Sequence, residues 1–115
     1  MPGISIHIVD VSRGVVAAGM QVELRDAGGR VLASGVANAK GLLEHPALGK
    51  TFAAGNYEAI FHVSAYYRQQ SDVALPSVPF LDVVHYGFGI SDSRQHYHLP
   101  FKCTPWGYSC FRGGA

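Results

Sequence analysis

The 115-residue chain is long enough for one domain with a single core, and its 48% hydrophobic and 15% charged residues exclude a disordered protein. A formal net charge of +1 without any basic run excludes a nucleic-acid-binding or anionic-membrane-binding surface, so we expect neither partner. No segment has the apolar length of a signal peptide or a bilayer span, which predicts one cytoplasmic domain over residues 1–115.

The first half of the chain predicts three strands. Ile4 to Val11 alternates between two faces, and residues at even positions, including Asp10, share one face while Ser5, His7 and Val9 share the other. Met20 to Arg25 and Val31 to Val36 are predicted to form a hairpin through a glycine-containing turn at residues 26–29. Residues 37–50 contain Pro46 and Gly49 and leave room for a short strand at most.

The second half predicts two further strands and the one expected helix. Tyr57 to Val63 alternates as a strand. Ser64 to Gln70 lacks that alternation and predicts about two helical turns, with Ser64 as the candidate N-cap. Phe80 to Ile90 is rich in β-forming residues, and its glycines indicate a bulge or a close backbone approach.

The C-terminal region predicts a hairpin. Gln95 to Cys103 and Gly107 to Arg112 are aromatic-rich extended segments separated by Thr104-Pro105-Trp106, where the proline favours a turn. Alternation places one set of side chains in the core: Tyr97, Leu99, Phe101 and Cys103. The opposite face carries His96, His98, Pro100 and Lys102. Two imidazoles on a polar strand face indicate a site that exchanges protons near neutral pH.

These elements add up to seven or eight short strands and one helix, with turn signals spaced as in an antiparallel sandwich. Cys103 and Cys110 flank the hairpin turn and can approach each other, although cytosolic cysteines are more often free thiols than a disulfide. The sequence has no Cys-x-x-Cys pair and no His-Glu-x-x-His, so we expect neither a metal nor another cofactor, although its six histidines leave a zinc site as the alternative.

Several motifs resemble the 5-hydroxyisourate hydrolases, the transthyretin-like enzymes of urate catabolism in purine metabolism. The chain offers HYHLP at residues 96–100, TPWGYS at 104–109 and FRGG at 111–114, beside the family's HYH-x-P, [ST]-P-aromatic-G-Y-S and aromatic-R-G-S. HIVD at 7–10 and NAKGL at 38–42 are similar to its H-[VI]-[LV]-D and N-x-D-G-R. The resemblance implies a transthyretin-like, all-β sandwich of two four-stranded antiparallel sheets with one short helix. It also implies a homotetramer whose active sites lie in a channel between paired dimers.

The same resemblance implies site residues. His7 and His98 correspond to histidines that line the family's active site, and we expect both to be catalytic. The substrate-binding positions that the resemblance indicates are Leu42, Ser109, Phe111, Arg112, Gly113 and Gly114. Three of these differ from the family pattern, since its arginine is Leu42, its tyrosine is Phe111 and its terminal serine is Gly114.

Each assignment has a structural alternative. His7 also fits a histidine on a half-exposed strand, His96 fits a solvated or structural one, and three others, His45, His62 and His85, are interpreted as structural. Arg112 is either the remaining contact for an anion or a salt-bridge partner at the chain end. Lys40 is a candidate replacement for the missing arginine, although an ammonium cannot reproduce a bidentate guanidinium.

Three functions follow from the sequence. The first is a hydrolase that opens a cyclic imide or urate-like ring by histidine-assisted attack of water. The second is a diverged enzyme of specialised metabolism that acts on a less anionic heterocycle, because Leu42 cannot pair with an anion. The third is a binding protein without catalysis that, like transthyretin, holds an apolar small molecule.

Overall fold

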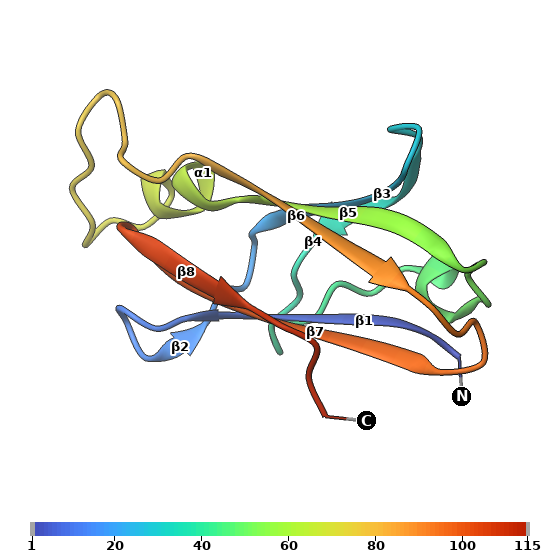
Figure 1. The fold of residues 1–115 in the computed structure, drawn as a ribbon. Coiled ribbons are helices and arrows are strands. Elements are labelled where there is room, and N and C mark those ends of the chain that lie inside the picture. Colours follow the sequence, from blue (N-terminus) through green and yellow to red (C-terminus); the bar gives the residue numbers. More distant parts are fainter. Residues whose placement is uncertain (1, 115) are drawn as a thin grey trace.

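The computed structural model describes residues 2–114, which form two four-stranded β sheets packed face to face (Figure 1). The first, here called the β1 sheet, has the strand order β2-β1-β7-β8. Its strands are β1 (Gly3–Asp10), β2 (Val15–Val16), β7 (His96–Thr104) and β8 (Gly107–Cys110). The second, the β3 sheet, has the order β4-β3-β5-β6 and contains β3 (Gln21–Asp26), β4 (Val31–Val36), β5 (Gly55–His62) and β6 (Val83–Ile90).

The inward faces of both sheets are the ones that the alternation of the sequence predicts. Every second residue of β1 and β7 is buried, from Ile4 to Asp10 and from Tyr97 to Cys103. The rings of Phe61 on β5 and Phe101 on β7 stack between the sheets with centroids 3.8 Å apart. This apolar layer fixes the opposite side chains of β1 and β7 on the outer surface.

One pairing differs from the expected antiparallel sheets. β1 and β7 run parallel, with Ser5 opposite His98 and His7 opposite Pro100, whereas the other strand pairs are antiparallel. Parallel neighbours need a long connection, and here the whole β3 sheet and the helix lie between the two strands in the sequence. The two elements that carry the expected catalytic histidines are therefore direct neighbours in the sheet.

The helix α1 (Val63–Arg68) confirms the predicted helical segment, but the predicted N-cap is wrong. His62 occupies the cap position, and Ser64 lies inside the helix, where its hydroxyl donates to the carboxylate of Asp82. A short 3-10 helix, η1 (Pro46–Gly49), was not predicted and begins at a proline as helical turns often do. Within residues 2–114 no helix is long and apolar enough to cross a membrane.

Two smaller predictions concern the loops and the cysteines. The predicted turn at residues 26–29 is closed by Asp26, whose carboxylate accepts hydrogen bonds from the backbone of Gly28 and Arg30. Cys103 and Cys110 are both free thiols, and burial raises the pKa of each to about 11.

Candidate active site

The outer face of β1 and β7 gathers the imidazoles that the sequence singled out. We call it the histidine face and define it by Ser5, His7, His96, His98 and Lys102. Because Ser5 lies opposite His98 in the parallel register, His7 is one strand across and two positions along from His98. Both histidines are half-buried on this surface. The structure thus brings together the two residues that were expected to act as a pair.

His7 is held by the loop that follows β4. Its Nε2 lies 3.1 Å from the carbonyl oxygen of Lys40, and since a carbonyl only accepts, Nε2 carries the proton. Neutral His7 therefore presents an unprotonated Nδ1. An isolated antiparallel bridge pairs His7 with Leu42, so the position where the resemblance implies an arginine lies directly beside His7.

The loop that carries Lys40 and Leu42 is tightly built. The side-chain Oδ1 of Asn38 accepts hydrogen bonds from the backbone nitrogens of Lys40 and Leu42 at 2.9 and 3.1 Å. Gly41 has a φ of +78°, and a Cβ there would approach the carbonyl oxygen of Ile8 to 2.7 Å. Only glycine fits that position, which explains the Asn-x-x-Gly spacing.

His98 is held by Ser5. Its Nδ1 lies 2.6 Å from Ser5 Oγ, and the same oxygen lies 2.8 Å from Nε2 of His96. Burial lowers the pKa of His98 below its ordinary value, and the nearby His7 and His96 lower it further. His98 is thereby favoured in its neutral form, which is the form that accepts a proton.

The C-terminal tail folds over β7 beside His98. The backbone nitrogen of Gly113 donates to the His98 carbonyl oxygen at 2.7 Å, and a Cβ on Gly113 would lie 2.7 Å from Cδ2 of the His98 ring. Gly114 is exposed and has open space around it. Of the two, Gly113 is the position where a side chain would collide with the site.

Arg112 makes contacts that neither of its two expected roles describes. Its Nη2 donates to Oε1 of Gln95 and to the carbonyl oxygen of His96, at 2.9 and 3.3 Å. Its guanidinium also stacks 4.0 Å from the centroid of the Tyr97 ring. In the described part of the chain Arg112 forms no salt bridge, so its visible contacts fasten the tail to β7.

Phe111 and Ser109 lie farther along the same surface. Ser109 is exposed and directly opposite Lys102 in the β7–β8 register, which puts both on one face of the sheet. The Nζ of Lys102 lies 5.7 Å from the centroid of the Phe111 ring, and the residue Phe111 is 45% exposed. Lys102 thus supplies a cation to the face that lacks the expected arginine.

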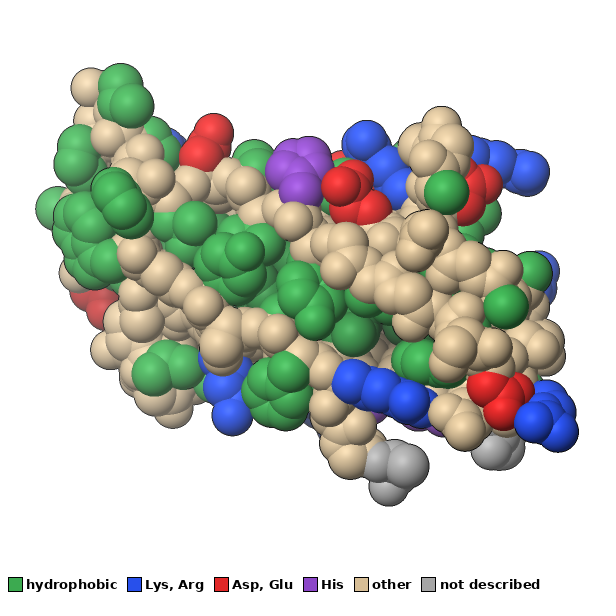
Figure 2. Space-filling view, viewed as in Figure 1, with side chains coloured by type: hydrophobic (Ala, Val, Ile, Leu, Met, Phe, Trp, Pro, Cys, Tyr) green, Lys and Arg blue, Asp and Glu red, His purple; other side chains and the backbone are tan. Residues whose placement is uncertain are grey.

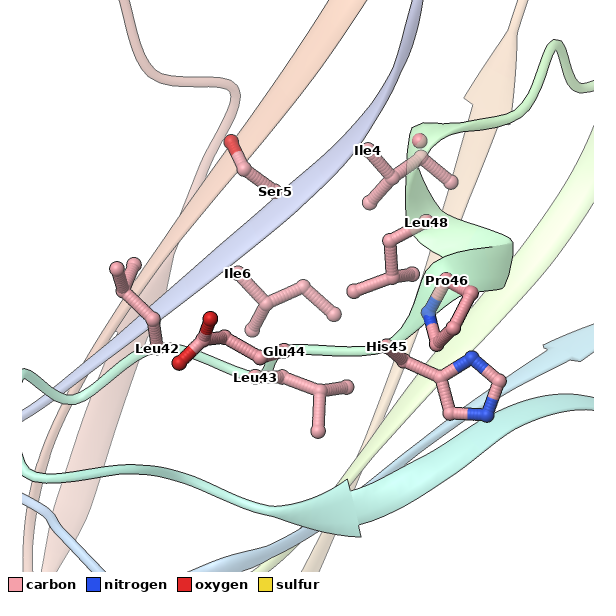
Figure 3. A pocket seen from close by; sticks show the side chains of 10 residues that line it. Ile4, Ser5, Ile6, Leu42, Leu43, Glu44, His45, Pro46 and Leu48 are labelled. Atoms are coloured by element: carbon pink, nitrogen blue, oxygen red, sulfur yellow. The ribbon is translucent and has the colours of Figure 1, made fainter.

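A cavity of about 510 Å³ opens beside β1, between Ile4, Ser5 and Ile6 and the segment from Leu42 to Gly49 (Figure 3). Ser5, Leu42 and Glu44 lie on one side of it, and Pro46 and Leu48 on the other. Its wall is mostly aliphatic, with the hydroxyl of Ser5 linking it to His98. The arrangement places an apolar recess next to Ser5 and His98.

Sequence reasoning put Lys102 on this face without giving it a role, and it missed Ser5 and the Lys40 carbonyl oxygen as parts of the site. Alternation already put Ser5 on the same face as His7, but its contact with His98 spans 93 residues of sequence. His45, His62 and His85 lie outside the histidine face: His45 caps η1, His62 contacts Glu23 at 3.0 Å and His85 contacts Glu58 at 3.5 Å. Among residues 2–114 no cluster of metal-binding side chains is present.

The fold and this face define a transthyretin-type β sandwich with a histidine site on one sheet. A family model described as the HIUase/Transthyretin family matches residues 4–113. The chain belongs to this family. It is 38% identical over 116 residues to a 5-hydroxyisourate hydrolase of Deinococcus radiodurans, an alignment that covers 97% of this chain and 96% of that protein.

Solved structures agree. A 5-hydroxyisourate hydrolase of Klebsiella pneumoniae superposes with a TM-score of 0.82 at 30% identity and covers 99% of this chain and 100% of its own. The crystal structure of (S)-allantoin synthase gives a TM-score of 0.87 at 31% identity over 97% of this chain, which spans only 43% of that longer protein. Sea bream transthyretin in complex with thyroxine, at 24% identity and a TM-score of 0.80, shares the fold.

Proposed function

We propose that this protein is a hydrolase that opens the ring of 5-hydroxyisourate. The observation that carries the proposal is that His7 and His98 share one face with different chemical settings. Burial and the neighbouring His7 and His96 lower the pKa of His98 and favour its neutral form, while His7 donates Nε2–H to a carbonyl oxygen and has Nδ1 free to take up a second proton. One group suited to take a proton and one able to give a proton are what ring hydrolysis needs.

In the proposed reaction, Nε2 of His98 removes a proton from water as the water oxygen bonds to the ring carbonyl carbon. The carbon–nitrogen bond of the ring then breaks, and protonated His7 donates its Nδ1 proton to the departing nitrogen. The hydroxyl of the water ends on the carbonyl carbon, and its other proton ends on His98. His98 then releases this proton to solvent and His7 takes one up from solvent, which restores both histidines. No metal or cofactor takes part in this sequence.

Substrate charge is met by Lys102 in this proposal. Leu42 cannot pair with an anion, whereas the Lys102 ammonium lies on the histidine face over Phe111. A lysine is a point charge without the fork of a guanidinium, so the substrate is held less rigidly than an arginine would hold it. Arg112 keeps its hydrogen bonds to Gln95 and His96 and thereby orders the tail.

We further propose that the active unit is a cytoplasmic homotetramer. β6 and β8 are edge strands of the two sheets, and hydrophobic side chains run along the side of the molecule where these two edges lie (Figure 2). Tyr108 on β8 is 47% exposed, and Tyr86 and Phe88 on β6 are half-buried. Unpaired edges beside aromatic side chains favour pairing with a second copy. Light scattering coupled to size exclusion tests the assembly, and Tyr108→Lys is expected to yield a smaller species.

The activity is tested by following the ultraviolet decay of freshly generated 5-hydroxyisourate. The wild-type protein is expected to accelerate decay over buffer, and His7→Ala and His98→Ala are expected to lower kcat by about a hundredfold or more. His85→Ala, on the other sheet, serves as the control. Decay at the buffer rate with all proteins would refute the proposal.

The apolar cavity beside Leu42 favours a second candidate, an enzyme or binder for a less anionic heterocycle. Leu42→Arg separates the two. If 5-hydroxyisourate is decomposed only after this change, the native pocket is built for another ring. If the wild-type protein already acts and Leu42→Arg lowers KM, the first function stands and Leu42 merely weakens binding.

A further inference from the structure

Ser5 connects two histidines that the proposed reaction treats separately. Its Oγ lies within hydrogen-bond distance of Nε2 of His96 at 2.8 Å and of Nδ1 of His98 at 2.6 Å. A hydroxyl has one proton and two lone pairs, so it can donate to at most one of these nitrogens, and it can accept from the other at the same time. Two arrangements let Ser5 donate to one ring while it accepts from the other, and they differ in which ring nitrogens carry protons.

In the first arrangement, His98 Nδ1–H donates to Ser5 and Ser5 donates to His96. The outer nitrogen of His98, Nε2, then has a free lone pair and is a base. In the second arrangement, His96 Nε2–H donates to Ser5 and Ser5 donates to His98 Nδ1. The outer nitrogen of neutral His98 then carries a proton and is an acid. The orientation of one hydroxyl therefore decides the chemistry of His98.

We infer that Ser5 is a positioning residue that couples His96 to His98 and carries protons between them, which rests on the proposed hydrolase function. When Nε2 of His98 takes a proton from water, the Nδ1 proton passes to Ser5 Oγ and the serine proton passes to Nε2 of His96. Three N–H or O–H bonds form and three break, and the serine ends as a hydroxyl. The first arrangement has become the second, and the positive charge rests on His96.

This displacement of charge suits the surroundings. His7 lies beside His98, and two neighbouring imidazolium ions repel each other. We call the chain of His98, Ser5 and His96 the proton relay. The charged and titratable groups around it are His7 on β1, Lys102 on β7, Arg112 in the tail and Glu44 across the cavity. Moving the proton to His96 keeps His98 neutral next to a protonated His7. The relay then runs in reverse, and His98 Nε2 returns the proton to solvent.

The positions of Ser5, His96 and His98 in the sheet also support a coupling between the two rings. Ser5, His96 and His98 are all half-buried, and they sit on adjacent parallel strands whose register fixes Ser5 opposite His98. The backbone of β7 at this point is further held by Gly113 and Arg112, which bond to the carbonyl oxygens of His98 and His96. Each ring thus has its backbone tied down as well as one nitrogen engaged.

The test compares Ser5→Ala with Ser5→Thr. Alanine removes the hydroxyl and threonine keeps it, so Ser5→Ala is expected to lose about tenfold to a hundredfold in kcat with little change in KM, and threonine to restore most of it. Ser34→Ala, an exposed serine on β4, is the control for the same change elsewhere. Thermal unfolding of each variant shows whether the fold is intact.

A second measurement reads the relay without any substrate. Nitrogen-15 NMR of the histidine rings is expected to show His96 and His98 titrating together in the wild type and separately in Ser5→Ala. Independent titration in the wild type would overturn the inference. The inference would also be overturned if Ser5→Ala is folded and keeps the wild-type kcat while His98→Ala is inactive. That result would leave the proposed hydrolase function standing. If the wild type lacks the activity while coupled titration is seen, the function fails and the relay survives.

Discussion

The backbone nitrogen of Gly113 and the carbonyl oxygen of His98 are 2.7 Å apart, and this hydrogen bond holds the C-terminal tail against the histidine face. The contact leaves no room for a side chain, because a Cβ on Gly113 would stand 2.7 Å from Cδ2 of the His98 ring and 3.1 Å from Cδ of Pro100. A residue near the end of the chain thereby sets the position of a residue in the middle of a strand.

Gly113→Ala is expected to displace the tail or the His98 ring and to lower kcat by about tenfold or more, since small misplacements of a proton-transferring group are costly. Stability should change little, because the tail lies at the surface. Activity assays and thermal unfolding measure the two effects. Gly87→Ala is the control, as a Cβ there meets nothing within 4 Å. Equal kcat in both variants would contradict the described contact.

Lys102→Met is expected to raise KM for an anionic substrate by up to about fivefold and leave kcat nearly unchanged, because an exposed charge contact contributes roughly 1 kcal/mol or less. Lys102→Arg should keep KM near the wild-type value. The difference should shrink in high salt, which screens exposed charges. Lys50→Met, at an exposed lysine next to η1, should leave KM unchanged.

The pH dependence of activity should follow His98. Its pKa is lowered from the ordinary 6.5, first by burial and then by His7 and His96, so the acid limb of kcat/KM is expected below that value. His7→Gln removes one of these causes, and the NMR titration of His98 should then move upward. An unchanged or lower midpoint in His7→Gln would show that the two imidazoles do not sense each other.

The same shift has a consequence for stability. Between the lowered pKa in the folded protein and 6.5 in the unfolded chain, the unfolded chain binds more protons at this site, so the free energy of unfolding falls as pH falls through that window. His98→Phe removes this contribution. Denaturant unfolding at several pH values should show a shallower acid decline for the variant than for the wild type.

A buried carboxylate holds α1 against the β1 sheet. Asp10 is fully buried and accepts hydrogen bonds from the hydroxyls of Tyr67 at 2.6 Å and Tyr66 at 3.0 Å. Burial and the bond to Asp10 raise the pKa of Tyr66 to about 12 and that of Tyr67 further. Both tyrosines therefore remain donors at any ordinary pH.

Tyr67→Phe is expected to lower the free energy of unfolding by about 2 kcal/mol, the usual loss for a hydrogen bond to a buried charge. Denaturant unfolding measures it. Tyr86→Phe is the matched control, because among the described residues the Tyr86 hydroxyl has no hydrogen-bond partner. If the free energy of unfolding falls by the same amount in the two variants, the hydrogen bond from Tyr67 to Asp10 does not add to stability.

Most of the fold could be predicted because alternation is a local signal. The pattern of β1 and β7 identified the buried faces and thereby the outward direction of His7 and His98. The parallel pairing of these strands could not be derived, since no local feature of either segment says which strand lies beside it or in which direction. The expected all-antiparallel sheets were wrong at that one pair.

The site was predictable only in part for the same reason. Ser64 was expected to cap α1 because its side chain suits that role, but Asp82, 18 residues away, competes for its hydroxyl. Ser5 carried no signal of its own, as its partners are more than 90 residues distant. The roles of Leu42, Ser109, Phe111, Arg112, Gly113 and Gly114 toward a substrate stay predictions.

The parallel neighbours β1 and β7 also bear on how the molecule is made. During synthesis Ile4, Ile6 and Ile8 emerge before their neighbour β7, which follows about 90 residues later. Strand pairings between segments so distant in sequence form slowly, and an unpaired apolar strand is prone to mispair or aggregate in the meantime. Chaperone demand during translation should therefore be governed by how long β1 remains alone.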